Sequence, residues 1–161
     1  QYEFNPHVAK GAVKWLDRHY YSEKDDNTLD CLNKLKADGY RIVATTPHTN
    51  DTLLPNFDVT KGKFALVFGT EQFGISNVVR NNADEFLRIP MHGFTESYNI
   101  SVSAALCFYE LSNKLQNCEL NWNLTENEVL DIEIDWAKKI ITRSESYEKE
   151  FIQNYSLEEN S

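Results

Sequence analysis

The sequence is poor in cysteine and in long apolar runs, and each shortage excludes a class of protein. Its three cysteines, Cys31, Cys107 and Cys118, are odd in number and do not have the spacing of a zinc site. We therefore expect reduced, buried thiols and no metal. No apolar run approaches the roughly 20 residues that span a bilayer, and no signal-peptide pattern opens the chain. The sequence thus predicts a cytoplasmic protein without a membrane partner.

Basic residues are also scarce. The 161 residues include 16 Lys and Arg against 25 Asp and Glu, which gives a net charge of −9. Proteins that bind nucleic acid usually carry a basic face, so any such face here must be local and masked by an acidic tail, or lie on sequence outside this chain. The chain begins with Gln1 and not with Met, which suggests a fragment.

Two strand-and-loop segments dominate the middle of the chain. The apolar run 64–68 leads into the loop 69–76, and the run 86–91, stopped by Pro90, leads into the polar loop 92–99. In an open α/β sheet, ligands bind in the crevice beyond the carboxyl ends of the strands. We therefore expect a ligand site where these two loops meet.

The segments before them continue the same alternation. A helix is predicted from Asn27 or Thr28 to Gly39, with Leu29, Leu32 and Leu35 on one side, and a buried strand over 40–45. Alternating helices and strands favour a parallel sheet flanked by helices. His48, in the loop after this strand, is a weak candidate for a general base, because it has no recognisable partner.

The last third is a separate compositional unit. Thr125 and Glu128 have the spacing of a capping box, and a broad apolar face follows. We expect a domain over 1–118, a helical extension over 119–155 and an acidic tail over 156–161. The apolar face comprises Val129, Leu130, Ile132, Ile134, Trp136, Ala137, Ile140 and Ile141.

The two strand-and-loop segments resemble two motifs of a known family. Residues 66–76 are similar to the second motif, and residues 89–105 to the third, of the SpoU/TrmH branch of the SPOUT RNA methyltransferases. A lone Gly-x-Glu-x-x-Gly is weak, but Ile-Pro-Met followed by Ser-x-Asn-x-Ser-Val is specific. The resemblance implies an α/β fold with a C-terminal trefoil knot, a homodimer formed through the helix 99–115, and S-adenosylmethionine (SAM) as cofactor.

The implied reaction is methyl transfer to a ribose 2′-hydroxyl of RNA. The helical extension resembles that of the tRNA guanosine methyltransferases, so the expected substrate is tRNA, at a D-loop guanosine. An rRNA substrate is the nearest alternative, and a non-catalytic SAM- or RNA-binding module is the competing class. The terminal helices either assist tRNA binding or only pack within their own subunit.

The motifs also imply site residues. Three of them are expected to shape the catalytic pocket: Glu71, Ser97 and Asn99. Five are expected around the cofactor: Thr45, Gly69, Ile89, Met91 and Tyr98. Tyr98 stands where the family most often has leucine, which puts the local shape of the pocket in question.

Each assignment has a structural alternative. Glu71 can stabilise the start of a helix from Ile75 through the helix dipole, and Ser97 and Asn99 can cap the next helix. Ile89 and Met91 can belong to the core as well as to a pocket. Gly69 is expected to let the backbone approach a ligand.

One family feature has no counterpart in this sequence. The first motif lies upstream of a Gly-Ala-x-x-Trp segment, here 11–15, and supplies an asparagine and an arginine that activates the ribose hydroxyl. Nothing before Lys10 resembles it, and no arginine falls in a matching context: Arg18, Arg41, Arg80, Arg88 and Arg143. We therefore expect this chain alone to bind SAM without methylating RNA.

Overall fold

The computed structural model describes residues 11–24, 26–47 and 51–158. The chain forms two compact units, one of residues 20–121 and the other of residues 1–19 together with 122–161. The first unit holds the sheet and both motifs, and the second holds the C-terminal helices.

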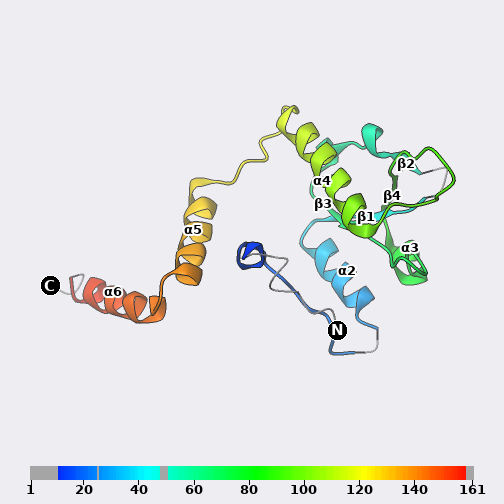
Figure 1. The fold of residues 1–161 in the computed structure, drawn as a ribbon. Helices are drawn as coiled ribbons and strands as arrows, with labels where there is room; N and C mark the ends of the chain where they lie inside the picture. The colour runs from blue at the N-terminus through cyan, green and yellow to red at the C-terminus, as the bar shows by residue number, and fades with distance from the viewer. Residues whose placement is uncertain (1–10, 25, 48–50, 159–161) are drawn as a thin grey trace. The chain divides into compact units, whose positions relative to one another are not determined.

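The first unit is built on a four-stranded parallel sheet with the order β2-β4-β1-β3 (Figure 1). The strands are β1 (Arg41–Thr45), β2 (Thr52–Leu53), β3 (Phe64–Val67) and β4 (Glu85–Arg88). The predicted strand over 86–91 ends earlier, at Arg88, two residues before Pro90, which has no N–H to donate to a ladder. The parallel sheet that the alternation predicts is confirmed.

Helices cover both faces of this sheet. In Figure 1, α2 (Thr28–Ala37) and α3 (Asn77–Asn82) lie on one side and α4 (Ile100–Gln116) on the other. Successive residues of a strand face opposite sides, so β1 contributes to two cores. Ile42 and Ala44 pack with Leu32 and Val79 under α2 and α3. On the other side, Val43 packs with Leu87, Cys107 and Leu111 under α4.

The two-residue β2 leads into short 3-10 helices on the α4 side of the sheet. These are η2 (Leu54–Asn56) and η3 (Val59–Lys61). Their buried side chains, Leu54 and Val59, join Phe57 in the core under α4. The two 3-10 helices thus cover the edge of this core near the C-terminal end of α4.

The α2 helix follows the sequence prediction except at its cap. Asn27 occupies the N-cap position, but its side chain makes no cap hydrogen bond there. Its Oδ1 accepts instead from the Lys24 N–H at 2.9 Å. At the other end Gly39, with φ of 83°, terminates the helix as expected.

The expected buried thiols are confirmed only in part. Cys107 is fully buried under α4, and burial raises the pKa of its thiol. Cys31 and Cys118 are half-buried. The Cys118 thiol donates to the Leu115 carbonyl at 3.1 Å.

The second unit contains a 3-10 turn, η1 (Ala12–Trp15), and two helices, α5 (Glu126–Ile140) and α6 (Ser144–Glu158). The predicted capping box is present, with the Thr125 N–H donating to Glu128 at 2.8 Å. The predicted apolar face ran to Ile141, but α5 ends at Ile140 and Arg143 turns the chain with a φ of 64°. No helix among the described residues is long and apolar enough to cross a membrane.

Candidate functional site

A cavity of about 350 Å³ lies where the loops after β1, β3 and β4 meet. This is the carboxyl edge of the parallel sheet, where α/β proteins bind ligands. Seven of the eight residues predicted for the site line the cavity: Thr45, Gly69, Glu71, Ile89, Met91, Ser97 and Tyr98. The eighth, Asn99, is joined to the cavity wall by a hydrogen bond.

Asn99 connects the two motif loops. Its Nδ2 donates to Glu71 Oε1 at 2.9 Å, and its Oδ1 accepts from the Ser101 N–H at 2.9 Å. One amide therefore caps α4 and holds the carboxylate that follows β3. Because both ends of the amide are engaged, the orientation of the Asn99 side chain is defined.

Glu71 does not cap the helix that follows its own loop. That helix, α3, begins at Asn77 and not at Ile75, and Ser76 caps it by accepting from the Val79 N–H at 3.3 Å. The carboxylate of Glu71 is thus directed to Asn99 and the cavity instead of to a helix end.

The loop after β3 is a closed turn. Thr70 and Gly74 exchange two backbone hydrogen bonds, of 3.0 and 2.8 Å. A Cβ on Gly69 would lie 2.2 Å from the carbonyl carbon of Gly74, so Gly69 is required for the turn to close on itself. Gly69 also lines the cavity, so its predicted place beside the cofactor stays a prediction next to this structural role.

The remaining predicted residues form the walls. The Thr45 hydroxyl donates to the Val67 carbonyl at 3.1 Å and so ties β1 to β3 at the mouth of the cavity. Ile89 lines the cavity and also packs against the core under α4, and its contact with the cofactor stays a prediction. Met91 is half-buried, and Tyr98 is 39% exposed.

The lining also includes residues that the sequence did not predict, and two of them, Arg80 and Phe73, differ in character from the rest. Among the described residues that line the cavity, Arg80 on α3 is the basic one, and Glu71 and Glu96 are the acidic ones. Its signal is weak, since it lies one turn after the cap residue Ser76 in a helix that the motif does not cover. Phe73 lines the cavity yet is 81% exposed. His48 lies outside the described residues.

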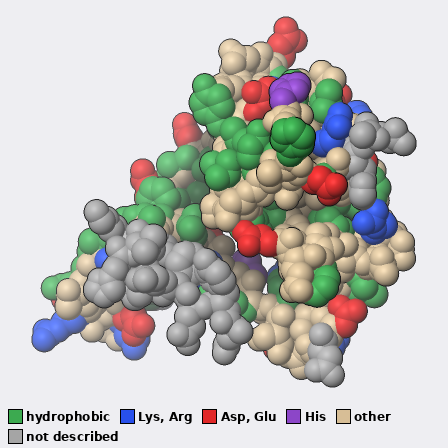
Figure 2. All heavy atoms as spheres, turned by 45° about the vertical axis from the view of Figure 1, so that its right-hand side comes forward, with side chains coloured by type: hydrophobic (Ala, Val, Ile, Leu, Met, Phe, Trp, Pro, Cys, Tyr) green, Lys and Arg blue, Asp and Glu red, His purple; other side chains and the backbone are tan. Residues whose placement is uncertain are grey.

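The face shown in Figure 2 carries acidic and basic side chains without a continuous basic patch among the residues that the structure describes. On the face turned forward in Figure 2, carboxylate side chains are scattered among apolar ones. Among the described residues, no three His, Cys, Asp or Glu side chains are grouped as ligands for a metal ion.

Comparison with known proteins identifies the same family as the motifs. Residues 2–109 match the model of the SpoU rRNA Methylase family. A tRNA (guanosine(18)-2'-O)-methyltransferase of Borreliella burgdorferi is 34% identical over 141 residues, covering 88% of this chain and 62% of the relative. One of Aquifex aeolicus is 31% identical over 84% of this chain and 63% of the relative.

The fold agrees with the sequence match. A crystal structure of the Aquifex aeolicus TrmH/SpoU tRNA modifying enzyme superposes with a TM-score of 0.65 at 28% identity, covering 87% of this chain and 70% of that one. The chain spans less than two thirds of the length of these two curated relatives. Since the family model covers more than half of the sequence and the structural match extends over most of it, the chain belongs to the SpoU/TrmH family of RNA methyltransferases.

Proposed function

We propose that the protein transfers a methyl group from SAM to a ribose 2′-hydroxyl of tRNA, at a D-loop guanosine. The hydrogen bond from Asn99 to Glu71 carries this proposal, because it joins the second and third motifs beside one cavity at the carboxyl edge of the sheet. The names of the relatives from Borreliella burgdorferi and Aquifex aeolicus support the choice of tRNA and guanosine.

The cavity fits the cofactor that the family uses. A volume of about 350 Å³ lies within the range of ligand pockets, roughly 300–1,000 Å³. Ile89 and Met91 offer apolar surface to a flat base, and Ser97 and Glu71 offer polar groups. When bound, SAM supplies an electrophilic methyl group on a sulfonium.

The task of the chain is then to position the acceptor hydroxyl. Asn99, fixed by Glu71 and by the start of α4, presents its amide in one orientation beside the cavity. Ser97, two residues before it, lines the same wall. Holding the reacting atoms in an attack geometry is worth several kcal/mol of the barrier, up to about 7–11 kcal/mol in ideal cases.

Among the described arginines, Arg80 lines the cavity, but it lies on α3 and not in a context that matches the family's first motif. Arg41 lies at the amino end of β1, away from the cavity edge, and binds Glu85 and the Asp58 carbonyl. A positioned proton-transfer group is worth about 10²–10⁴-fold in rate. We therefore expect this chain to bind SAM and to leave RNA unmethylated, and efficient methylation by it would contradict the role given to that arginine.

Calorimetry with SAM, followed by methyl transfer to unmodified tRNA and to rRNA, tests the proposal. Absence of SAM binding would overturn the assignment of the cavity. Transfer to rRNA but not tRNA by an active form of the protein would favour the alternative substrate. If this chain and longer forms of the protein all bind SAM and RNA but transfer no methyl group, the protein is a non-catalytic binding module.

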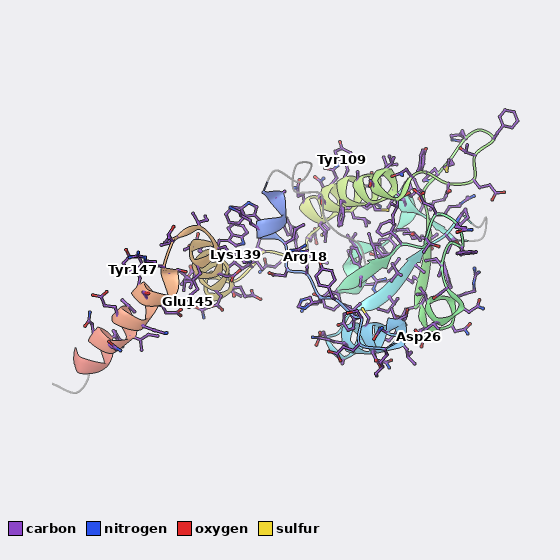
Figure 3. All side chains as sticks on the ribbon, turned by 60° about the horizontal axis from the view of Figure 1, so that its bottom comes forward. Arg18, Asp26, Tyr109, Lys139, Glu145 and Tyr147 are labelled. Atoms are coloured by element: carbon purple, nitrogen blue, oxygen red, sulfur yellow. The ribbon has the colours of Figure 1, made fainter. Side chains whose placement is uncertain are left out.

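We also propose a homodimer formed through α4. This helix has two apolar sides: Cys107 and Leu111 are buried on the sheet, while Val102, Leu106 and Tyr109 form an exposed stripe. Tyr109 points away from the helix (Figure 3) and is 72% exposed. A stripe at positions i, i+4 and i+7 is a helix-packing surface. A monomer mass in light scattering at micromolar concentration would contradict the dimer.

The trefoil knot is proposed for the segment that follows β4. In the family this segment carries the third motif, and here it runs from Ile89 through the cavity wall to the Asn99 cap of α4. Stretching single molecules from both ends should leave a shorter contour length than a fully extended, unknotted chain of this size.

A further inference from the structure

Two phenylalanine side chains project from the loops that border the cavity. Phe73, in the closed turn after β3, is 81% exposed, and Phe94, in the loop after β4, is 108% exposed. Both values are extreme for a large apolar side chain, and neither ring belongs to a core cluster. Large exposed apolar side chains grouped at one place mark binding surfaces more often than isolated ones do.

The backbone holds Phe73 in its exposed position. Its N–H donates to the Thr70 hydroxyl at 3.1 Å, inside the turn that Thr70 and Gly74 close with two backbone hydrogen bonds. Phe73 itself lines the cavity. The ring is therefore displayed at the cavity mouth by an ordered turn.

Phe94 is presented in a comparable way. It follows Gly93, whose φ of 120° is a conformation that other residues rarely adopt. On either side of it, Met91 and Glu96 line the cavity, so the Phe94 ring leaves the loop between two wall residues. Phe73 and Phe94 thus project from the two loops whose residues line the cavity.

The charges at this opening favour one kind of contact. Among the described residues that line it, Glu71 and Glu96 lie beside one cation, Arg80, so these residues do not form the row of cations that would track an RNA backbone. Stacking of a base on an aromatic ring does not need such a row, because every base has an apolar face.

We propose that Phe73 and Phe94 form a stacking platform for unpaired RNA bases next to the ribose that receives the methyl group. The inference rests on the proposed function, because it takes RNA as the occupant of the opening. Beyond the proposed function, the inference states that two aromatic residues, which are not among the polar residues of the motifs, bind the substrate by stacking on its bases. Single-stranded loops are the form of RNA that proteins recognise by stacking.

The platform can be tested by fluorescence with the whole chain. The probe is a tRNA D-loop oligoribonucleotide that carries 2-aminopurine beside the target guanosine, whose emission changes on stacking. Phe73→Ala and Phe94→Ala should each weaken binding by 5- to 150-fold, which is about 1–3 kcal/mol at 1.4 kcal/mol per tenfold. Phe108→Ala is the matched control, because Phe108 is 63% exposed on α4 and does not line the cavity.

A second set of substitutions distinguishes the effect of the aromatic ring from the effect of apolar side-chain volume. Phe73→Trp keeps an aromatic face and should retain binding within about threefold, whereas Phe73→Leu keeps apolar bulk and should bind as weakly as Phe73→Ala. Full recovery by leucine would mean that the side chain is covered by apolar packing, as in contact with a second copy of the chain, and would overturn the platform. Unchanged affinity in both alanine variants, or no fluorescence change in the wild type, would overturn it too.

The outcome is distinguishable from failure of the proposed function. SAM affinity is measured by calorimetry in the same preparations, and Phe94→Ala, which lies outside the cavity lining, should keep it within about twofold. SAM binding with no loss of RNA affinity in the variants rejects the platform alone. Absence of SAM binding in the wild type rejects the proposed function.

Discussion

Asn99 performs two tasks with one side chain. Its carbonyl oxygen caps α4 through the Ser101 N–H, and its amino group fixes the carboxylate of Glu71. From the sequence, the cap and the site role were alternatives for this residue. The structure has the cap and also a hydrogen bond into the site, because the two ends of an amide can serve different partners.

Replacing Asn99 separates these two tasks. Asn99→Ala should lower the free energy of unfolding by only about 1 kcal/mol, the usual cost of a lost cap. Methyl transfer in an active form of the protein should fall at least tenfold, since Glu71 loses its partner. Urea unfolding and rate measurements check both effects.

Ser76→Ala is the matched control for Asn99→Ala. Ser76 caps α3 in the same unit by accepting from the Val79 N–H, and it does not line the cavity. It should cost similar stability and leave the rate within about twofold. Unfolding of Asn99→Ala, or a full rate in that variant, would contradict the site role.

The site residues that the sequence predicted are those at positions where the motifs specify a particular side chain. Glu71 and Ser97 stand at fixed places in the motifs, and both line the cavity. Arg80 and Phe73 also line it, but they stand at positions where the motif specifies no side chain. Their role depends on which loops the fold brings together, which a local pattern does not encode.

At the scale of elements, Asp84 joins three parts of the first unit. It lies just before β4; its Oδ2 accepts from the Ile42 N–H of β1 at 2.7 Å, and its Oδ1 from Lys36 of α2 at 3.1 Å. Burial raises the pKa of this carboxyl, but the hydrogen bonds from Ile42 and Lys36 outweigh burial and hold the pKa below the usual 3.8.

This shift predicts an acid-dependent stability. A carboxyl whose pKa is lower in the folded state stabilises the fold above its unfolded pKa, and the contribution disappears as the pH falls through the folded value. Asp84→Asn should therefore lower Tm at pH 7, and the difference from wild type should shrink below pH of about 3.8. Asp30→Asn, which removes an exposed pair with Lys24, should change Tm little. A difference that stays constant with pH would contradict this account.

The exposed stripe of α4 makes a prediction about assembly. Leu106→Glu places a charge in the middle of the stripe and should convert a dimer to a folded monomer in light scattering, because an unpaired buried charge is costly. Phe108→Glu is the control, since Phe108 lies about 200° around the helix from Leu106. Dissociation by both variants, or by neither, would place the interface elsewhere.

Two basic residues of α5, Lys138 and Lys139, are engaged with acidic neighbours. Lys138 pairs with Glu148 at 2.5 Å, and Lys139 pairs with Asp135 and, at 3.6 Å, with Asp17. Hydrogen bonding to Asp135 raises the pKa of Lys139. Trp15 also stacks edge-on against Trp136 with ring centroids 5.1 Å apart. These contacts favour packing within the unit as the role of α5 over contact with RNA.

For the whole molecule, the sequence predicted the class of fold but not its connectivity. Alternating helices and strands indicated a parallel sheet, and each predicted strand is present. The order β2-β4-β1-β3 and the pairing of residues 1–19 with 122–161 did not follow from any pattern. Both depend on contacts between residues far apart in sequence, which local periodicity does not constrain.

The net charge of −9 leads to a prediction about RNA binding by the whole molecule. For a single-stranded RNA, the logarithm of affinity falls with the logarithm of salt with a slope of about −0.7 per phosphate contacted. With Arg80 as the lining cation and aromatic rings as the main grip, we expect one or two such contacts. Between 50 and 200 mM salt the affinity should then fall by about 3- to 7-fold, less than the 10³-fold or more of a protein with many contacts.

Arg80→Ala should make the slope shallower by about 0.7, and Arg80→Lys, which keeps the charge, should restore it. Fluorescence titrations at four salt concentrations measure these slopes, and a loss of 100-fold or more would mean that a basic surface, not the aromatic platform, holds the RNA.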